Sequence, residues 1–166
     1  MTAMRYPSGA TMDLTVSVIG SAVPAADTDS AARDVGRLLA AADAVVVCGG
    51  LGGVMAAVCQ GAQEAGGRTI GVLPGVDAAT ANPWVDVALP TGMGEARNVL
   101  VARAGRAVIA VGGGFGTLSE IAFARKLQIP VVGLDTWTLP DDGIIHVHTP
   151  DEAVRVALSA ARPAPG

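Results

Sequence analysis

The sequence predicts an α/β protein with a Rossmann-like, doubly wound and mostly parallel sheet that carries helices on both faces. Hydrophobic residues make up 51% of the 166 residues and charged residues only 16%, which is typical of strands that are buried on both faces. Short β-branched runs alternate with helical segments, and this order indicates right-handed βαβ units. Three glycine-bearing turns follow strand-like runs, at the sheet edge where such folds bind ligands.

The length of the chain favours one domain with a substantial core, because a domain near 150 residues buries roughly 68–70% of its unfolded surface. We expect a flexible N-terminus at residues 1–12 and one Rossmann-like domain at residues 13–161. A flexible tail is expected at residues 162–166, which are rich in proline.

Seven runs have the length and composition of strands. In chain order, strands are predicted at residues 14–20, 44–48, 69–73, 85–89, 107–111, 131–134 and 145–147. The first run is β-branched and ends at Gly20, and the second is apolar throughout and stops at Gly49. Both endings therefore place a glycine at the carboxyl end of a strand.

Five helices are predicted between or after these strands. In chain order, they run from a cap within residues 27–30 to about 42, from 54 to about 65, from 95 to 104, from about 118 to 126, and from 150 onward. The first places Ala32, Val35 and Leu39 on one face. The last begins with a capping box, Thr149 to Glu152, that has proline at its first helical position.

Charge and hydropathy exclude several classes of partner. The formal net charge is −4 and Lys and Arg form no cluster, so nucleic acid is not expected to bind. No apolar run approaches the ~20 residues that span a bilayer, and residues 1–12 lack the apolar core of a signal peptide. We therefore expect a cytoplasmic protein with no membrane partner.

No metal centre is predicted. Cys48 and Cys59 have neither the spacing nor the companions of a redox pair or a zinc knuckle, and we interpret them as small buried hydrophobic residues. His146 and His148 share a strand face, but no third ligand is visible, so we interpret both as structural.

The strongest functional signal is the run Gly112-Gly113-Gly114-Phe115-Gly116-Thr117, between a predicted strand and a predicted helix. Glycine lets the backbone approach an anion, and a helix N-terminus supplies free N–H groups and about half a positive charge. The run is not a Walker loop, and no G-x-G-x-x-G turn follows the first strand, which argues against ordinary NAD binding. We predict that it binds the phosphate of a small nucleotide-like ligand; a tight turn without a ligand is the alternative.

Two other glycine turns are expected at the same sheet edge, so that three chain segments form one site. The residues predicted to bind the ligand there are Gly20, Ser21, Gly49, Gly50, Gly53, Gly113, Gly114, Gly116 and Thr117.

Two charged residues are candidates for chemistry in this site. Thr117 to Glu120 fits a capping box, but a carboxylate at a phosphate site can also orient water or a ribose hydroxyl, or stabilise an oxocarbenium-like centre. Both interpretations of Glu120 remain open. For Arg97 a solvated surface position is the default, and the alternative is that its guanidinium reaches a phosphate or Glu120.

Taken together, these motifs resemble the LONELY GUY (LOG)-like superfamily, long mislabelled as possible lysine decarboxylases. Within it they are most similar to a compact branch that includes the molybdenum cofactor carrier proteins. The resemblance covers nearly the whole chain and rests on residues 20–21, 49–55, 71–74, 91–98 and 112–120. The family signature Pro-Gly-Gly-x-Gly-Thr-x-x-Glu matches this chain from Gly113 to Glu120, with Gly112 in place of the proline.

The resemblance implies one of two functions. The chain would bind a phosphorylated small molecule, either a nucleotide or a pterin phosphate such as molybdenum cofactor, with no cofactor required. Alternatively, it would be a nucleoside 5′-monophosphate phosphoribohydrolase, in which Arg97 and Glu120 form the catalytic pair that releases free base and ribose 5-phosphate. The lysine that usually follows the arginine is Asn98 here, and the choice between binder and hydrolase stays open.

The resemblance also implies a homodimer or homotetramer, formed through helices beside the glycine loop. The decarboxylase label is excluded by the sequence itself. A pyridoxal enzyme needs a lysine for its Schiff base, and Lys126, the only lysine, lies near the end of a predicted helix away from the glycine turns.

Overall fold

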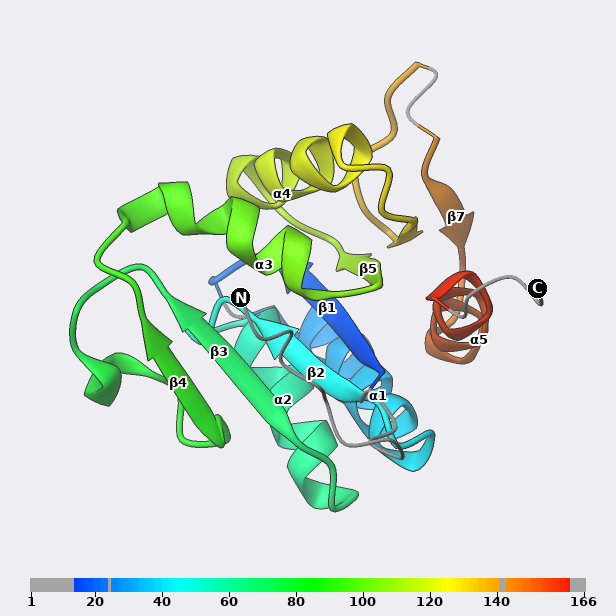
Figure 1. The fold of residues 1–166 in the computed structure, drawn as a ribbon. Coiled ribbons are helices and arrows are strands. Elements are labelled where there is room, and N and C mark those ends of the chain that lie inside the picture. The colour runs from blue at the N-terminus through cyan, green and yellow to red at the C-terminus, as the bar shows by residue number, and fades with distance from the viewer. Residues whose placement is uncertain (1–13, 24, 141–142, 162–166) are drawn as a thin grey trace, which may run out of the picture.

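The chain folds as alternating strands and helices around one parallel sheet (Figure 1). This computed structural model describes residues 14–23, 25–140 and 143–161, so the segments predicted to be flexible, 1–12 and 162–166, lie outside the described residues. In chain order the strands are β1 (Thr15–Gly20), β2 (Val45–Cys48), β3 (Thr69–Leu73), β4 (Val87–Pro90), β5 (Ala107–Val111), β6 (Val131–Leu134) and β7 (Ile145–Val147). The α-helices are α1 (Ala26–Ala41), α2 (Val54–Glu64), α3 (Asn98–Ala104), α4 (Phe115–Lys126) and α5 (Pro150–Ala161), with 3-10 turns η1 (Ala78–Thr80) and η2 (Gly94–Arg97).

The strands lie in the order β4-β3-β2-β1-β5-β6-β7, and every neighbouring pair is parallel. From β1 the chain adds strands on one side as far as β4, and it then returns to place β5 on the other side of β1. The strand order therefore reverses between β1 and β5, where Gly20 pairs with Val111. A doubly wound sheet opens a ligand crevice at this point.

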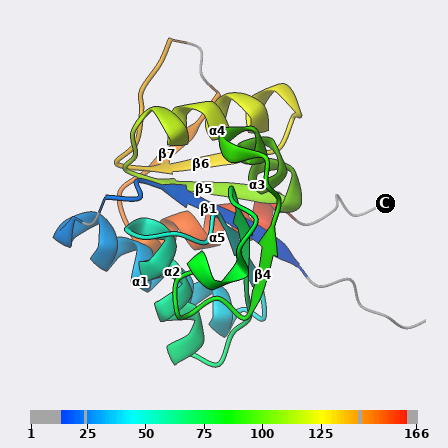
Figure 2. The ribbon, with the colours of Figure 1, turned by 90° about the vertical axis from the view of Figure 1, so that its left-hand side faces the viewer.

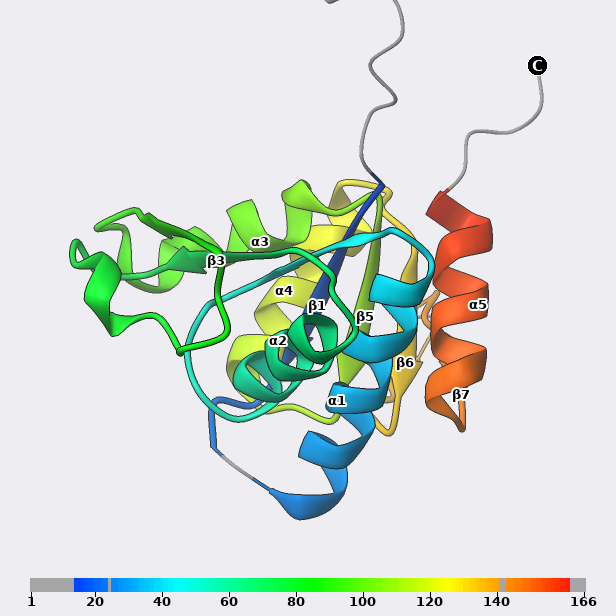
Figure 3. The same ribbon diagram turned by 90° about the horizontal axis from the view of Figure 1, so that it is seen from below.

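Helices cover both faces of the sheet (Figure 2). Helices α1, α2 and α5 pack on one face, as Figure 3 shows from below, and α3 and α4 pack on the other. None of the helices in the described residues is long and apolar enough to cross a membrane. The predicted Rossmann-like α/β class is confirmed.

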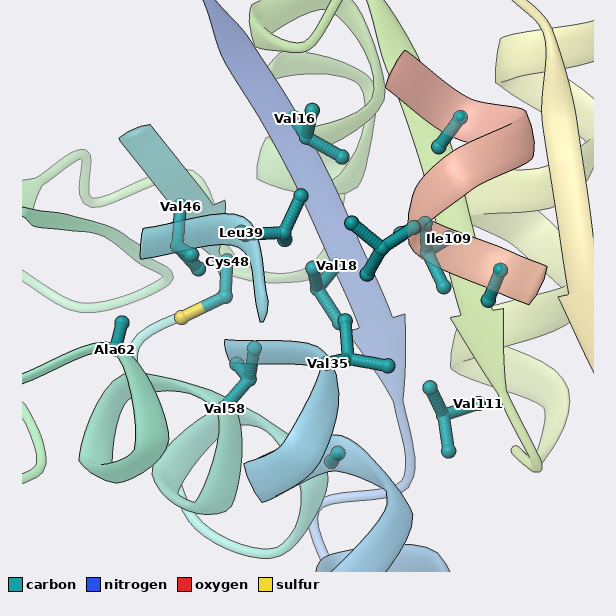
Figure 4. Close-up of a cluster of buried hydrophobic side chains, with 14 of the residues drawn as sticks. Val16, Val18, Val35, Leu39, Val46, Cys48, Val58, Ala62, Ile109 and Val111 are labelled. Carbon is teal, nitrogen blue, oxygen red and sulfur yellow. The ribbon is translucent and has the colours of Figure 1, made fainter. Parts of the chain in front are cut away.

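The larger core lies between the sheet and the α1, α2 and α5 layer (Figure 4). Val35 and Leu39 of α1, predicted to share a face, are both fully buried against this side of the sheet. The smaller core lies under α3 and α4 and includes Ile19, Val108 and Ile121.

Helices α1 and α2 approach each other closely enough to require glycine at the contact. A Cβ at Gly36 would lie 2.0 Å from the Val58 carbonyl oxygen, and one at Gly61 would lie 1.9 Å from the Arg33 carbonyl oxygen. Any larger residue at either position would push the helices apart.

Several predicted element boundaries are corrected by the structure. The strand predicted at 85–89 begins at Val87. Asp86 belongs to the turn before β4, where its carboxylate accepts a hydrogen bond from the Thr69 amide at 2.8 Å. The predicted helix 95–104 is divided into the 3-10 turn η2 and the short helix α3. Helix α1 begins at Ala26, with Ala25 as its N-cap, so the predicted cap residues 27–30 form its first turn.

The capping box of the last helix is confirmed. The Glu152 amide donates to Thr149 Oγ1 at 3.2 Å, and the Glu152 carboxylate accepts a hydrogen bond from the His148 amide at 3.0 Å. Hydrogen bonds from the His148 and Thr149 amides to the carboxylate hold the pKa of Glu152 below its ordinary value.

Candidate functional site

A pocket of about 230 Å³ lies at the carboxyl ends of β1 and β2, where the strand order reverses. It is formed by the ends of these strands, the turn η2 and the first turns of α2, α3 and α4. Its lining residues are Ile19, Gly20, Ser21, Ala22, Gly49, Leu51, Met55, Glu95, Arg97, Asn98, Gly114, Gly116, Thr117 and Glu120. All three glycine turns thus contribute to one pocket.

The glycine loop enters helix α4 beside this pocket, and Gly114, Gly116 and Thr117 line it. Gly112 and Gly113 have φ angles of +53° and +118°, and Gly114 is the N-cap of the helix. The first backbone hydrogen bond of the helix runs from the Leu118 amide to the Gly114 carbonyl at 3.0 Å. The amides of residues 115–117 precede that bond, so they and the positive end of the helix dipole are available to an anion.

The capping interpretation of Glu120 is wrong. Helix α4 begins at Phe115 rather than near Leu118, so Thr117 is the third helical residue and cannot be the N-cap. The glycines allow the chain to enter the helix earlier than the pattern predicts, because they tolerate the backbone angles of the turn. Glu120 consequently lies one turn inside the helix, is only 5% exposed and lines the pocket.

Arg97 is buried rather than solvated, which corrects the default expectation. It is 6% exposed, and its Nη2 donates to the Gly49 carbonyl oxygen at 3.3 Å. Its Nη1 donates to Asn98 Oδ1 and lies 3.9 Å from Glu120 Oε1. Its Nε is buried and has no hydrogen-bond partner among the described residues. A desolvated guanidinium with an unpaired donor is costly unless a ligand completes it.

The two charged candidates therefore lie together but do not form a tight ion pair. Burial raises the pKa of Glu120 to about 8, and the negative charge of Glu95 adds to this rise while Arg97 opposes it. At neutral pH the Glu120 carboxyl accordingly holds a proton, and the guanidinium charge is left without a carboxylate partner. The pocket thus combines the positive charge of Arg97, the negative charge of Glu95, helix amides and a Glu120 carboxyl that can donate a hydrogen bond when it is protonated.

Two polar pocket residues were not assigned to the site from the sequence. Glu95 and Asn98 flank Arg97, and the 3-10 turn brings residues three apart to the same side: Asn98 Nδ2 lies 3.5 Å from Glu95 Oε2. Asn98 is 3% exposed, and its Nδ2 also donates to Ser119 Oγ at 3.0 Å. Both residues are polar and lie within two positions of Arg97 in the sequence, and this proximity is the signal from which their place in the site could have been predicted.

Three of the predicted binding glycines lie outside the pocket lining. A Cβ at Gly50 would meet Leu73, one at Gly53 would lie 2.2 Å from the Ser21 carbonyl oxygen, and one at Gly113 would lie 2.5 Å from the Thr117 side chain. All three have positive φ angles. They shape the turns that carry the pocket residues.

The cysteines are buried, as predicted, and their Sγ atoms lie 3.5 Å apart. Within the described residues, no group of three or more His, Cys, Asp or Glu side chains could hold a metal ion.

An all-parallel sheet with a pocket at its switch point defines a Rossmann-like protein of the doubly wound type. More specifically, the chain belongs to the SLOG cluster4 family, whose model matches residues 13–161. The predicted resemblance to a compact LOG-like branch is confirmed by this match.

Relatives of known sequence or structure cover nearly the whole chain. An uncharacterized protein of Archaeoglobus fulgidus is 38% identical over 146 residues, which is 88% of this chain and 95% of the relative. The molybdenum cofactor binding protein of the phototrophic bacterium Rippkaea orientalis is similar in structure, with a TM-score of 0.85 and 32% identity over 90% of this chain and 98% of that chain. The molybdenum cofactor carrier protein of Chlamydomonas reinhardtii has a TM-score of 0.81 and 32% identity, with the same coverage of both chains.

Proposed function

We propose that this protein binds a phosphorylated small molecule in the pocket, either a nucleotide or a pterin phosphate such as molybdenum cofactor. The observation that carries the proposal is the buried Arg97, whose Nε has no partner among the described residues, in the same pocket as the first turn of α4. A buried cation beside a helix N-terminus favours an anionic ligand. The structural likeness to molybdenum cofactor binding and carrier proteins supports a pterin phosphate.

The pocket offers a different contact to each part of such a ligand. The amides at the start of α4 and the Arg97 guanidinium would hold the phosphate. The protonated Glu120 would donate to a hydroxyl or carbonyl oxygen, and apolar Leu51 and Met55 would contact the ring system. Gly20 and Ser21, at the end of β1, would form the opposite wall.

Calorimetry tests the proposal with AMP, ribose 5-phosphate and molybdenum cofactor released from a molybdoenzyme. We expect the wild type to bind at least one of them and Arg97→Ala to weaken that binding by about 10- to 100-fold, because a hydrogen bond to a charged group is worth about 1.5–3 kcal/mol. Arg97→Lys keeps the positive charge but loses the planar guanidinium. It therefore distinguishes the effect of the charge on binding from that of the hydrogen-bond geometry, and it replaces the alanine variant if that variant folds poorly. Arg103→Ala, at an exposed arginine on α3, is the matched control. Absence of binding by the wild type to all three probes would overturn the proposal.

The second candidate function is hydrolysis of a nucleoside 5′-monophosphate to free base and ribose 5-phosphate. It is favoured by the two carboxyl groups that line the pocket, Glu95 and Glu120, since the second is protonated at neutral pH and suited to act as a general acid. Incubation with AMP and CMP followed by an assay for ribose 5-phosphate separates the two functions. Turnover of AMP or CMP that is abolished by Glu120→Gln would refute the proposal that the protein only binds its ligand.

We also propose that the protein is a homodimer or homotetramer. Apolar side chains lie exposed on α3 and α4, the helices beside the glycine loop, among them Leu100, Phe115 and Phe123, which are 39%, 82% and 36% exposed. A second copy of the chain would cover them. Light scattering coupled to size-exclusion chromatography tests this, and a monomer mass at micromolar concentration would contradict it.

A further inference from the structure

Asn98 connects the buried guanidinium to the glycine segment of α4. Its Oδ1 accepts a hydrogen bond from Arg97 Nη1, and its Nδ2 donates to Ser119 Oγ at 3.0 Å. Ser119 Oγ in turn donates to the Gly116 carbonyl oxygen at 2.7 Å. A continuous chain of hydrogen bonds thus runs from Arg97 to the first turn of α4.

The directions of these hydrogen bonds fix the orientation of the amide. Arg97 can only donate, so the amide must present its oxygen to Arg97 and its nitrogen to Ser119. A carboxylate at this position would neutralise the guanidinium, and an ammonium would repel it. An amide accepts from the guanidinium without adding charge to the pocket.

The position of Arg97 relative to Glu120 depends on this contact. Both side chains are buried, and one is basic while the other is acidic. The distance between Arg97 Nη1 and Glu120 Oε1 is nevertheless 3.9 Å, which is longer than the roughly 2.7–2.9 Å of a charge-assisted hydrogen bond. Nη1 donates to Asn98 instead, and Nη2 donates to the Gly49 carbonyl oxygen. The guanidinium is thereby tethered on two sides.

We propose that Asn98 is a positioning residue that holds the guanidinium of Arg97 away from Glu120 and so keeps its positive charge available to an anionic ligand. The second half of this inference rests on the proposed function. Without the Asn98 amide, Nη1 moves onto the Glu120 carboxyl, and the internal ion pair then competes with the ligand for the same charge.

The ligand-free protein reports this movement through the titration of Glu120. The groups that face Glu120 are Arg97 and Glu95 from η2 and the Cys48 thiol at the end of β2. A substitution at Asn98 leaves Cys48 in place but removes the contact at 3.5 Å between Asn98 Nδ2 and Glu95 Oε2, and Glu95 raises the pKa of Glu120. Glu95→Gln is therefore combined with each Asn98 variant, and a lowering of the Glu120 pKa that persists in this background follows from the approach of Arg97.

Asn98→Leu tests the inference because leucine has a similar volume and no hydrogen-bonding group. Carbon-13 NMR of the glutamate carboxyls, with Glu120→Gln to assign the resonance, gives the pKa in the absence of ligand. We expect Asn98→Leu to lower it by about one pH unit or more and to weaken ribose 5-phosphate binding by about tenfold. Ser119→Ala removes the next link and has a smaller effect in the same direction. Ser159→Ala, at an exposed serine on α5, changes neither quantity.

The outcomes separate this inference from the proposed function. An unchanged Glu120 pKa in folded Asn98→Leu protein overturns the positioning role, even if the wild type binds ribose 5-phosphate. A lowered pKa without binding of any phosphorylated probe by the wild type supports the positioning role and refutes the proposed function. If Asn98→Leu does not fold, Ser119→Ala decides, and an unchanged pKa in that variant overturns the inference.

Discussion

The buried carboxyl of Glu120 predicts an unusual dependence of stability on pH, which Glu120→Gln should remove. Burial raises the pKa of this group from 4.5 to about 8 in the folded protein. Between these two values the unfolded chain loses the proton while the folded chain keeps it. The folded state binds more protons in this window, so the contribution of Glu120 to stability is greatest below about pH 4.5 and falls as the pH rises.

The size of the effect follows from the interval between the two pKa values. At about 1.36 kcal/mol for each pH unit, the contribution of Glu120 to the free energy of unfolding decreases by about 5 kcal/mol between pH 4.5 and 8, and it is constant at higher pH. Glutamine has nearly the shape of the protonated carboxyl and no charge to desolvate. The variant should therefore match the wild type near pH 4.5 and exceed it increasingly toward pH 8.

Urea unfolding of both proteins at pH values from 4.5 to 9, followed by circular dichroism, measures this difference. Other titrating groups are the same in the two proteins, so subtraction of the two profiles isolates Glu120. Parallel profiles across the whole range would refute the argument, because they would mean that Glu120 ionises in the folded protein as it does in the unfolded chain.

Three further substitutions test the backbone and packing of the fold. Gly113→Ala forces a φ of +118° on alanine and places its Cβ 2.5 Å from the Thr117 side chain, so it should destabilise the protein by about 1–3 kcal/mol. Gly75→Ala is the control and should change stability little, because nothing lies within 4 Å of a Cβ at that position. Equal losses of stability in the two variants would contradict the strain assigned to Gly113. Gly61→Ala places a Cβ 1.9 Å from a carbonyl oxygen of α1 and should lower the urea midpoint by an amount equivalent to about 2 kcal/mol or more. Thr149→Ala removes the N-cap hydrogen bond of α5 and should cost about 1 kcal/mol, whereas an unchanged thermal midpoint would show that the cap contributes nothing.

Local patterns predicted most of the architecture. The apolar runs at 69–73, 107–111 and 131–134 are strands with the predicted boundaries, because each contains enough β-branched or apolar residues to be buried in the sheet. Residues 145–147 also form a strand with the predicted boundaries, but only Val147 is buried in it. Boundaries were wrong where glycine or a turn intervened, as at the start of α4 and in the segment 94–97. A glycine backbone permits several entry points to a helix, and the sequence does not choose among them.

The sequence by itself determined the order of the elements, the family, and the convergence of three glycine turns on one edge of the sheet. Only the tertiary structure decided that Arg97 and Glu120 are buried together and that Asn98 links Arg97 to α4. These properties join residues that are far apart in the chain: Arg97 contacts Gly49 across 48 positions, and Asn98 contacts Ser119 across 21. The charge state of Glu120 depends on how much water the surrounding segments exclude, and that quantity exists only once the chain has folded.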